Sequence, residues 1–355
     1  MGVVRQRMRQ LDRSANDRKL HVFGSFSTVD SSVGIAPVKI SGNNNRNAAI
    51  DLFKCFLMVG ICLRHAINFS GLATGFEVRL WSWAVPAFAF ISGYYGVRFS
   101  GWKIVNLCAI AVCCAIVPTL IANFQGASSF RDCLLYNWYL NAYLVLVLLS
   151  PIINAGLDCA KQKPVLLAPL GGLMVWCWLS EQWGTRNWVP HLHGIGSQSF
   201  FALLFPYVLA WVYREFDIGR RLTRRRIIFI GLMALGLMPL FGRNTSPVTL
   251  AFVVVLFAAF ERMKIPVFLE HMVAFLLPSV FPVYLLHTNA VGFSFIRDFC
   301  ARATCNWGLS NYGAFLACGL VIFIGCLVLD MPRRLLFRLI SWCGSFGDKG
   351  MVKRI

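Results

Sequence analysis

Ten apolar runs divide this chain, several of them long enough to cross a bilayer, and they constrain its fold more than any other feature. Charged residues or clusters of Pro, Gly and Asn separate the runs. Inside a bilayer the backbone N–H and C=O groups must be paired within the protein, so such runs fold as helices. We therefore expect an all-α, polytopic membrane protein with about ten transmembrane helices, over 48–70, 80–97, 104–123, 134–153, 164–180, 199–213, 227–242, 246–260, 272–294 and 311–330. The runs at 227–242 and 246–260 are close enough to form a tight hairpin.

Composition and charge agree with this interpretation. Of the 355 residues, 57% are hydrophobic and only 14% are charged, which excludes a typical soluble globular domain. The net charge of +19 does not indicate nucleic acid binding, because the basic residues concentrate in alternate segments between the runs. This bias favours ten spans with both termini in the cytoplasm. The stretch RRLTRRR at 220–226 is then expected to contact the inner leaflet of the lipid bilayer, and we expect no nucleic acid partner.

The ends of the chain and its cysteines give weaker signals. Residues 1–45 are polar and basic without the apolar region of a signal peptide, so we expect a disordered cytoplasmic tail there and a second basic cytoplasmic tail over 341–355. The 13 cysteines are scattered, with no C-x-x-C pair and no Cys/His spacing typical of a metal site, so no metal is expected. Cys300 and Cys305 share a predicted outer loop, and their pairing as a disulfide is a hypothesis.

The first run carries four ionisable residues in the stretch DLFKCFLMVGICLRHA, residues 51–66. Lys54 and His65 are eleven residues apart, so they lie within roughly 20° of each other around a helix axis. Asp51 is three residues before Lys54, which is close enough for an ion pair, whereas Arg64 points about 100° away. One interpretation is that Asp51 and Lys54 reach the interface and His65 is a packed, hydrogen-bonded side chain. The other is that this face lines a polar cavity crossing the membrane.

A cavity with a cation at its inner mouth and a histidine deep inside suits a transfer reaction. A phosphate-bearing donor would enter from the cytosol, and a hydroxyl acceptor would come from the other side. Histidine can take a proton from a hydroxyl near neutral pH and pass it on, which makes His65 a candidate general base. No serine or cysteine with an adjacent base stands out in the sequence, so direct transfer is simpler than a covalent intermediate.

The same residues resemble a known family. Ile50-Asp51-x-x-Lys54, followed by ten residues and His65, resembles the first span of the acyltransferase family 3 membrane proteins, in which an arginine stands at the position of Lys54. The stretch VPAFAFISGYYGVR (85–98) is similar to the family's second span, although Ala89 replaces an aromatic residue. NWYLNAYLVLVLLSPIIN (137–154) and VYLLHTNA (283–290) are similar to its fourth span and to a late Tyr-Leu-x-His segment. The resemblance covers residues 46–340.

The resemblance implies a multi-pass enzyme of the bacterial cytoplasmic (inner) membrane, an O-acyltransferase. It would move an acetyl or other short acyl group from acetyl-CoA to a hydroxyl of a cell-surface or exopolysaccharide glycan, or of its lipid-linked precursor. His65 would be the catalytic histidine, Lys54 would bind the CoA phosphates or the thioester oxygen, and Asp51 would orient Lys54. Lysine keeps the positive charge of the family's arginine but lacks its planar fork, which puts that role in question. Arg46 is a second candidate for the CoA phosphates or for inner-leaflet lipid.

Further candidates each have a structural alternative. Ser92 and Gly93 either position the acyl group or allow close helix packing, and Tyr94 and Tyr95 either line the cavity or anchor a span end. The aromatic residues at the start of the fourth run suit sugar stacking or an interfacial girdle; these are Trp138, Tyr139 and Tyr143. His287 inside a run is a functional hypothesis by default, with the first span as its expected partner. His191 and His193 lie in the longest loop, which is expected to be solvated or to form an acceptor lid.

A second class of function stays open, because proton-coupled secondary transporters also hold ionisable residues inside their spans. The asymmetry of the chain argues against a transporter. Its intramembrane charges are concentrated in the first run, and the second half offers little beyond His287. A scaffold without activity is disfavoured by the cost of the same charges, unless the lysine at position 54 has disabled the site.

Overall fold

The structure, a computed structural model, describes residues 47–125, 130, 134, 137–182 and 199–351. Within these residues 85% are helical and no strand is present, so the predicted all-α fold is confirmed for the described chain. The described residues divide between two units, 47–333 and 334–351. In the second unit the described residues form the end of one long helix. All side-chain contacts below belong to the first unit.

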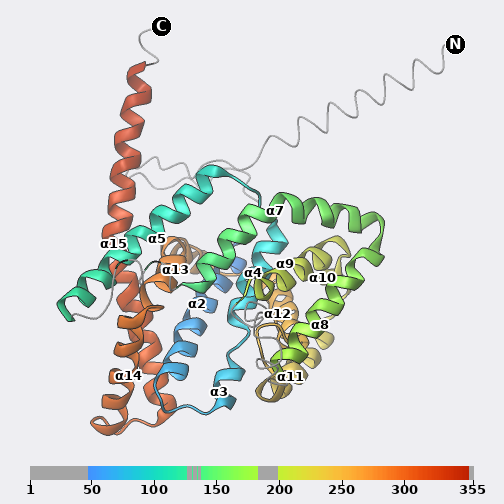
Figure 1. Ribbon diagram of the computed structural model, residues 1–355, viewed down its shortest axis with the longest axis horizontal. Helices are drawn as coiled ribbons and strands as arrows, with labels where there is room; N and C mark the ends of the chain where they lie inside the picture. The colour runs from blue at the N-terminus through green and yellow to red at the C-terminus, as the bar shows by residue number, and fades with distance from the viewer. Residues whose placement is uncertain (1–46, 126–129, 131–133, 135–136, 183–198, 352–355) are drawn as a thin grey trace, which may run out of the picture. The chain divides into compact units, whose positions relative to one another are not determined.

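The helices follow the predicted runs (Figure 1). Each run contains a helix or a large part of one, because a helix pairs the backbone N–H and C=O groups within the segment itself. The elements are α2 (Ala48–Phe69), α3 (Gly75–Leu80), α4 (Ala84–Tyr95), α5 (Gly101–Gln125), α7 (Trp138–Gln162), η1 (Pro164–Leu167), α8 (Ala168–Gln182), α9 (Phe200–Glu215), α10 (Ile218–Arg221), α11 (Arg224–Phe241), α12 (Pro247–Glu261), α13 (Val267–His287), α14 (Ala290–Cys305) and α15 (Asn311–Met351).

Four helices of the described chain are long and apolar enough to cross a membrane by length and composition. They are Gly101–Ile121, Trp138–Gln162, Val267–His287 and Asn311–Ile340. Two shorter apolar helices cover Pro164–Leu179 and Pro247–Glu261. The chain therefore has the character of an all-α membrane protein, while the predicted count of ten spans is not reached by these criteria. The expected hairpin is present, since α11 and α12 pack against each other across a short turn.

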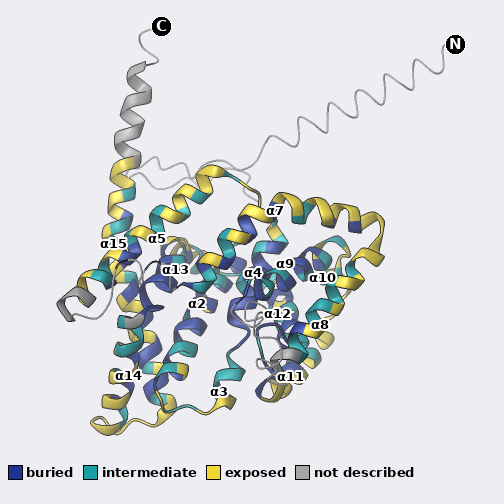
Figure 2. Ribbon diagram, in the orientation of Figure 1, coloured by how far each residue is buried: buried dark blue, intermediate teal, exposed yellow. Residues whose placement is uncertain are grey.

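Helix α2 lies at the centre of the packing and contacts α13, α4, α14 and α12. Its side chains Phe53, Leu57 and Cys62 are fully buried. The ribbon of α2 is coloured mostly as buried or intermediate (Figure 2). Helix α4 packs closely on α9, because Gly93 has no side chain to separate the two backbones. A Cβ atom at Gly93 would lie 2.2 Å from the carbonyl oxygen of Tyr207. The small-residue packing expected at this position is therefore present.

The end of the ninth run differs from expectation. Helix α13 ends at His287, and the Asn289 side chain accepts a hydrogen bond from the Gly292 amide at 3.0 Å as the N-cap of α14. Residues expected to form an outer loop are thus helical. Cys300 and Cys305 both lie on α14, both are free, and five residues place them about 140° apart around the axis. The hypothesis of a disulfide between them is therefore wrong in this structure.

Prolines inside the helices leave carbonyl groups that need other donors, and side chains supply them. Pro151 has no N–H for the carbonyl oxygen of Val147, and the Ser150 hydroxyl donates to that oxygen at 2.8 Å. Pro282 likewise leaves the carbonyl oxygen of Pro278 without its helical donor, and Arg333 Nη2 donates to it at 3.2 Å. The second contact ties α13 to α15.

Candidate active site

Two histidines from helices far apart in the sequence form the centre of the candidate site. His65 Nδ1 of α2 lies 3.0 Å from His287 Nε2 of α13. His287 is buried, whereas His65 retains partial exposure. The rings of Phe69 and Phe293 approach the His65 ring edge to face, with centroids 5.7 Å and 6.0 Å away. The expectation that His287 pairs with the first span therefore matches the geometry.

A hydrogen bond between His287 and the backbone shows which ring nitrogens carry protons when both histidines are neutral. His287 Nδ1 lies 2.5 Å from the carbonyl oxygen of Val283, which can only accept a hydrogen bond, so this nitrogen carries the proton. In a neutral ring His287 Nε2 is then an acceptor, and His65 Nδ1 must be the donor to it. The lone pair of His65 Nε2 is left for another partner. The pair is thus arranged so that one nitrogen of His65 can act as a base.

The face of α2 predicted from the sequence is present. Lys54 Nζ donates to Asp51 Oδ1 at 2.9 Å, and the same amine lies 5.8 Å from the centroid of the Tyr95 ring. Met58 and Ile61 follow on this face, spaced by four and three residues, and His65 is four residues further along. Met58 and Ile61, which lie between Lys54 and His65, both line a cavity. One face of α2 therefore carries, in order, the ion pair of Asp51 and Lys54, two residues that line a cavity, and His65 of the histidine pair.

This cavity, which we call the aromatic cavity, has a volume of about 300 Å³. Its wall includes Met58 and Ile61 from α2, Ser92 from α4, Tyr139 and Tyr143 from α7, and Tyr284 from α13. The remaining lining residues are apolar, so the cavity is mainly apolar and aromatic rather than polar as expected. It ends one helical turn short of the histidine pair, and the rings of Tyr284 and His287 lie 6.1 Å apart.

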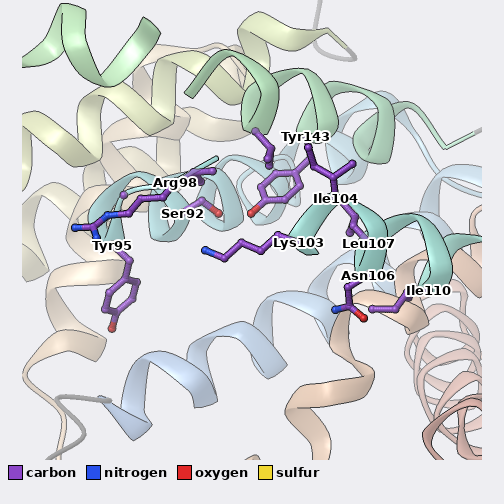
Figure 3. Close-up of a pocket in the computed structure, with 12 residues that line it drawn as sticks. Ser92, Tyr95, Arg98, Lys103, Ile104, Asn106, Leu107, Ile110 and Tyr143 are labelled. Carbon is purple, nitrogen blue, oxygen red and sulfur yellow. The ribbon is translucent and has the colours of Figure 1, made fainter. Parts of the chain in front are cut away.

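A second cavity of about 300 Å³, which we call the basic cavity, adjoins the first. Arg98 and Lys103 lie in its wall together with Tyr95 and Asn106 (Figure 3). The Lys103 side chain extends from α5 toward Tyr95 in this view. The two cavities share Ser92, Leu107 and Tyr143, and the Ser92 and Tyr143 hydroxyl groups point toward one another at the junction. A cationic end and an aromatic end are thus connected.

Other sequence candidates take different places. The Tyr94 hydroxyl donates to Glu261 Oε1 at 2.6 Å, and Tyr213 donates to the other oxygen of the same carboxylate at 2.6 Å. Trp138 packs edge to face against Tyr139, with centroids 5.9 Å apart, and it lines neither cavity described above. Arg46, His191 and His193 lie outside the described residues.

The sequence analysis missed one buried acid. Asp330 is 1% exposed, and it accepts hydrogen bonds from Arg333 Nε at 2.5 Å and from the Ser279 hydroxyl at 2.6 Å. Its signal is in the sequence, because Asp330-x-x-Arg333 repeats the spacing of Asp51-x-x-Lys54. The statement that the second half holds little beyond His287 is therefore wrong. Arg98 and Lys103 were also missed as site residues, because basic residues between two runs were considered only for the orientation of the chain in the membrane.

No group of three or more metal-ligating side chains is found among the described residues. No protein-family model, no curated protein and no solved structure matches the chain.

Proposed function

We propose that this protein is a membrane O-acyltransferase that moves an acetyl or other short acyl group from cytosolic acyl-CoA to a hydroxyl group of a glycan. The observation that supports it most is the hydrogen-bonded pair of His65 and His287. The pair lies near the aromatic cavity, which shares three lining residues with the basic cavity that holds Arg98 and Lys103. The resemblance of the first span to acyltransferase family 3 points to the same chemistry. In this proposal the chain crosses the cytoplasmic membrane about ten times, with both termini in the cytoplasm.

The histidine pair supports a direct transfer. His65 Nε2 takes the proton of the acceptor hydroxyl, and the oxygen attacks the thioester carbonyl carbon. The carbon–sulfur bond then breaks, and the CoA sulfur leaves with the proton that His65 had taken. His287 Nε2 accepts a hydrogen bond from His65 Nδ1 throughout, which holds the orientation and the tautomer of the His65 ring. Such a base typically contributes about 10²- to 10⁴-fold to a rate.

The two cavities support a path for the donor. Arg98 and Lys103 at the basic cavity are suited to the phosphates of CoA, because guanidinium and ammonium groups form charge-assisted hydrogen bonds to phosphate oxygens. The thioester arm then passes the junction at Ser92 and follows the aromatic cavity toward His65. Lys54 is already paired with Asp51 and lies beside Tyr95. In this proposal it therefore forms part of the wall of the donor path, and it is not the main contact of the phosphates.

The test uses the full chain purified into lipid nanodiscs and supplied with radiolabelled acetyl-CoA and bacterial surface glycan. Free CoA is measured by chromatography and O-acetyl groups on the glycan by NMR. The wild type is compared with His65→Ala, and His271→Ala is the matched control. His271 also has Nδ1 near the carbonyl four residues before it, at 2.8 Å, but its side chain is exposed.

We expect transfer by the wild type and by His271→Ala, and a loss of at least about 100-fold in His65→Ala. Equal loss in both variants would show a general effect on folding and count against a catalytic His65. Transfer that survives in His65→Ala would reject the proposed mechanism.

A proton-coupled transporter is the second candidate, favoured by one observation. Asp330 gives the second half of the chain a buried ionisable group, which removes part of the asymmetry that argued against transport. The same assay separates the two, because a transporter would release no CoA and acylate no glycan with any donor. Substrate uptake into proteoliposomes that responds to a pH gradient and depends on Asp330 would then support transport.

A further inference from the structure

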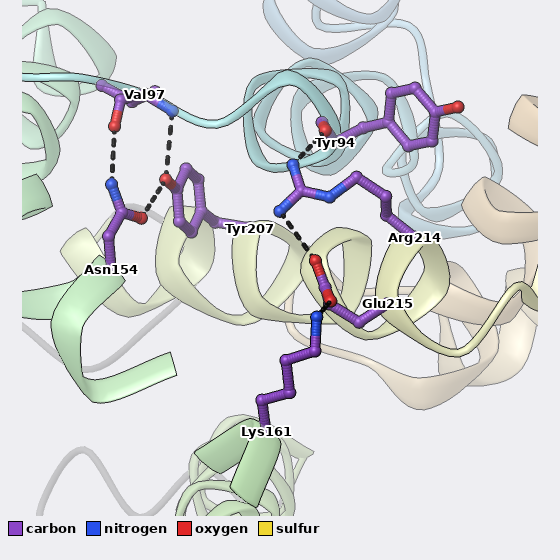
Figure 4. Close-up of polar contacts among 7 residues, drawn as sticks. All are labelled: Tyr94, Val97, Asn154, Lys161, Tyr207, Arg214 and Glu215. Atoms are coloured by element: carbon purple, nitrogen blue, oxygen red, sulfur yellow. Dashed lines mark hydrogen bonds and ion pairs between the residues drawn. The ribbon is translucent and has the colours of Figure 1, made fainter. Parts of the chain in front are cut away.

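A closed ring of hydrogen bonds holds the backbone beside the basic cavity (Figure 4). The Val97 amide donates to the Tyr207 hydroxyl at 3.1 Å, and this hydroxyl donates to Asn154 Oδ1 at 2.8 Å. Asn154 Nδ2 completes the ring by donating to the Val97 carbonyl at 2.9 Å. Three segments are joined in this way: α7 through Asn154, α9 through Tyr207, and the link between α4 and α5 through Val97.

The ring lies where the chain changes direction toward the cavity. Gly96 has a positive φ of 75° and ends α4, which releases the backbone from the helix. Val97 follows with both of its backbone polar groups in the ring, and Arg98 is the next residue. Tyr95, Gly96, Val97 and Arg98 all line the basic cavity. The position of its arginine therefore depends on a backbone that Tyr207 and Asn154 hold at two points.

A second contact fixes the preceding residues. Arg214 Nη1 of α9 donates to the carbonyl oxygen of Tyr94 at 2.7 Å, which satisfies one of the carbonyls left without a donor at the end of α4. The segment 94–97 is thus bound to α9 at its beginning and at its end.

We infer that Tyr207 and Asn154 are positioning residues for donor binding: their ring with Val97 holds Arg98 and Tyr95 in the wall of the basic cavity, where the phosphates of an acyl-CoA bind. This inference rests on the proposed function. Neither side chain contacts the histidine pair, so their loss changes donor affinity and leaves the chemical step intact.

The chain supplies a matched control for the joining of α7 to α9. Lys161 Nζ of α7 donates to Glu215 Oε2 of α9 at 2.5 Å, near the ring but on an exposed surface (Figure 4). This hydrogen bond lowers the pKa of Glu215, so its carboxyl group is ionised at neutral pH. Lys161→Ala therefore removes a bridge between the same helices without touching Val97.

Kinetics of acyl transfer give the first readout. We expect Tyr207→Phe and Asn154→Ala each to raise KM for acyl-CoA by about tenfold, with kcat changed by less than about twofold. The double variant is expected to match the single variants, because either change opens the ring. Lys161→Ala is expected to keep the wild-type KM. A KM that is unchanged in both ring variants overturns the inference.

A second readout does not depend on activity. Arg98 is exposed, so trypsin can cleave the chain after it, and mass spectrometry of the fragments gives the cleavage rate. We expect about fivefold faster cleavage at Arg98 in Tyr207→Phe and Asn154→Ala than in Lys161→Ala, because the ring restrains local opening. CoA is expected to slow this cleavage in the wild type. A rate that is equal in all variants overturns the positioning role.

The two readouts separate this inference from the proposed function. If no variant, including the wild type, transfers an acyl group but CoA still protects Arg98 and the ring variants lose this protection, the enzyme proposal fails and the positioning role stands. If transfer is normal and CoA gives no protection at Arg98, the enzyme proposal stands and the inference fails.

Discussion

His65 Nδ1 and His287 Nε2 lie 3.0 Å apart although 222 residues separate them in the chain. The carbonyl oxygen of Val283 fixes the proton on His287 Nδ1, and this in turn makes His65 the donor within the pair. The protonation of the candidate base is therefore decided by a backbone group on another helix. A residue that never contacts the substrate can in this way decide whether His65 works.

The role of His287 is testable by substitution. We expect His287→Ala to lower kcat for acyl transfer by about 10- to 100-fold, because the His65 ring loses the acceptor that fixes its tautomer. His287→Gln is expected to recover part of this loss, since an amide oxygen can accept the same hydrogen bond. Single-turnover kinetics with radiolabelled acyl-CoA measures both. Equal activity of the Ala and Gln variants would contradict the tautomer argument.

The ion pair on α2 is expected to act on stability as well as on the donor path. Lys54→Met leaves the buried Asp51 carboxylate without its amine, which should lower the free energy of unfolding by about 1–3 kcal/mol. Lys54→Arg should keep both stability and transfer. Adding Asp51→Asn to Lys54→Met is expected to restore much of the stability. Thermal unfolding in matched nanodiscs checks these changes, and an additive double variant would argue against a direct pair.

Ser92 provides a test of the connection between the two cavities, because it lines both of them. Ser92→Phe places a ring at the junction and is expected to abolish transfer while thermal stability stays close to that of the wild type. Ser92→Ala removes only the hydroxyl and should transfer nearly as well as the wild type. If Ser92→Phe remains active, the donor does not use this path.

Gly93 tests the packing of α4 on α9. Gly93→Ala brings a Cβ atom to within 2.2 Å of the Tyr207 carbonyl oxygen, so we expect a loss of about 1–3 kcal/mol in the free energy of unfolding. Gly236→Ala is the control, because nothing lies within 4 Å of a Cβ atom there. It should be neutral or gain up to about 1 kcal/mol from higher helix propensity. Similar unfolding temperatures for the two variants would contradict the close approach.

The ion pair of Asp330 and Arg333 on α15 predicts a strong coupling between the two side chains. Arg333→Met leaves Asp330 buried without its cation and removes the donor to the Pro278 carbonyl, which should cost about 3–5 kcal/mol. Asp330→Asn combined with Arg333→Met removes the uncompensated charge and is expected to recover most of this. Urea or thermal unfolding of the two single variants and the double variant measures the coupling. If the losses in the free energy of unfolding of the two single variants add up in the double variant, the two side chains do not stabilise the protein as a pair.

Local patterns in the sequence determined a large part of the fold. The helices follow the apolar runs because a helix satisfies its own backbone within a segment and needs no distant partner. The helical period placed Lys54 and His65 on one face and Asp51 beside Lys54, and the ion pair of Asp51 and Lys54 is present. Helix α14 was missed because its N-cap, Asn289, lies within an apolar run, and hydropathy alone does not show a cap.

The tertiary structure decided which of these residues meet. The sequence indicated His65 and His287 separately, but their contact depends on how α2 packs against α13, and many pairings of helices satisfy the same hydropathy. The ring of Val97, Tyr207 and Asn154 depends likewise on three segments brought together. Packing also decided that the aromatic cavity is apolar, because the helices opposite α2 contribute tyrosine and phenylalanine side chains to its wall and no charged ones. The sequence determines which side chains lie on each face of a helix, whereas the packing of the helices determines which faces contact one another.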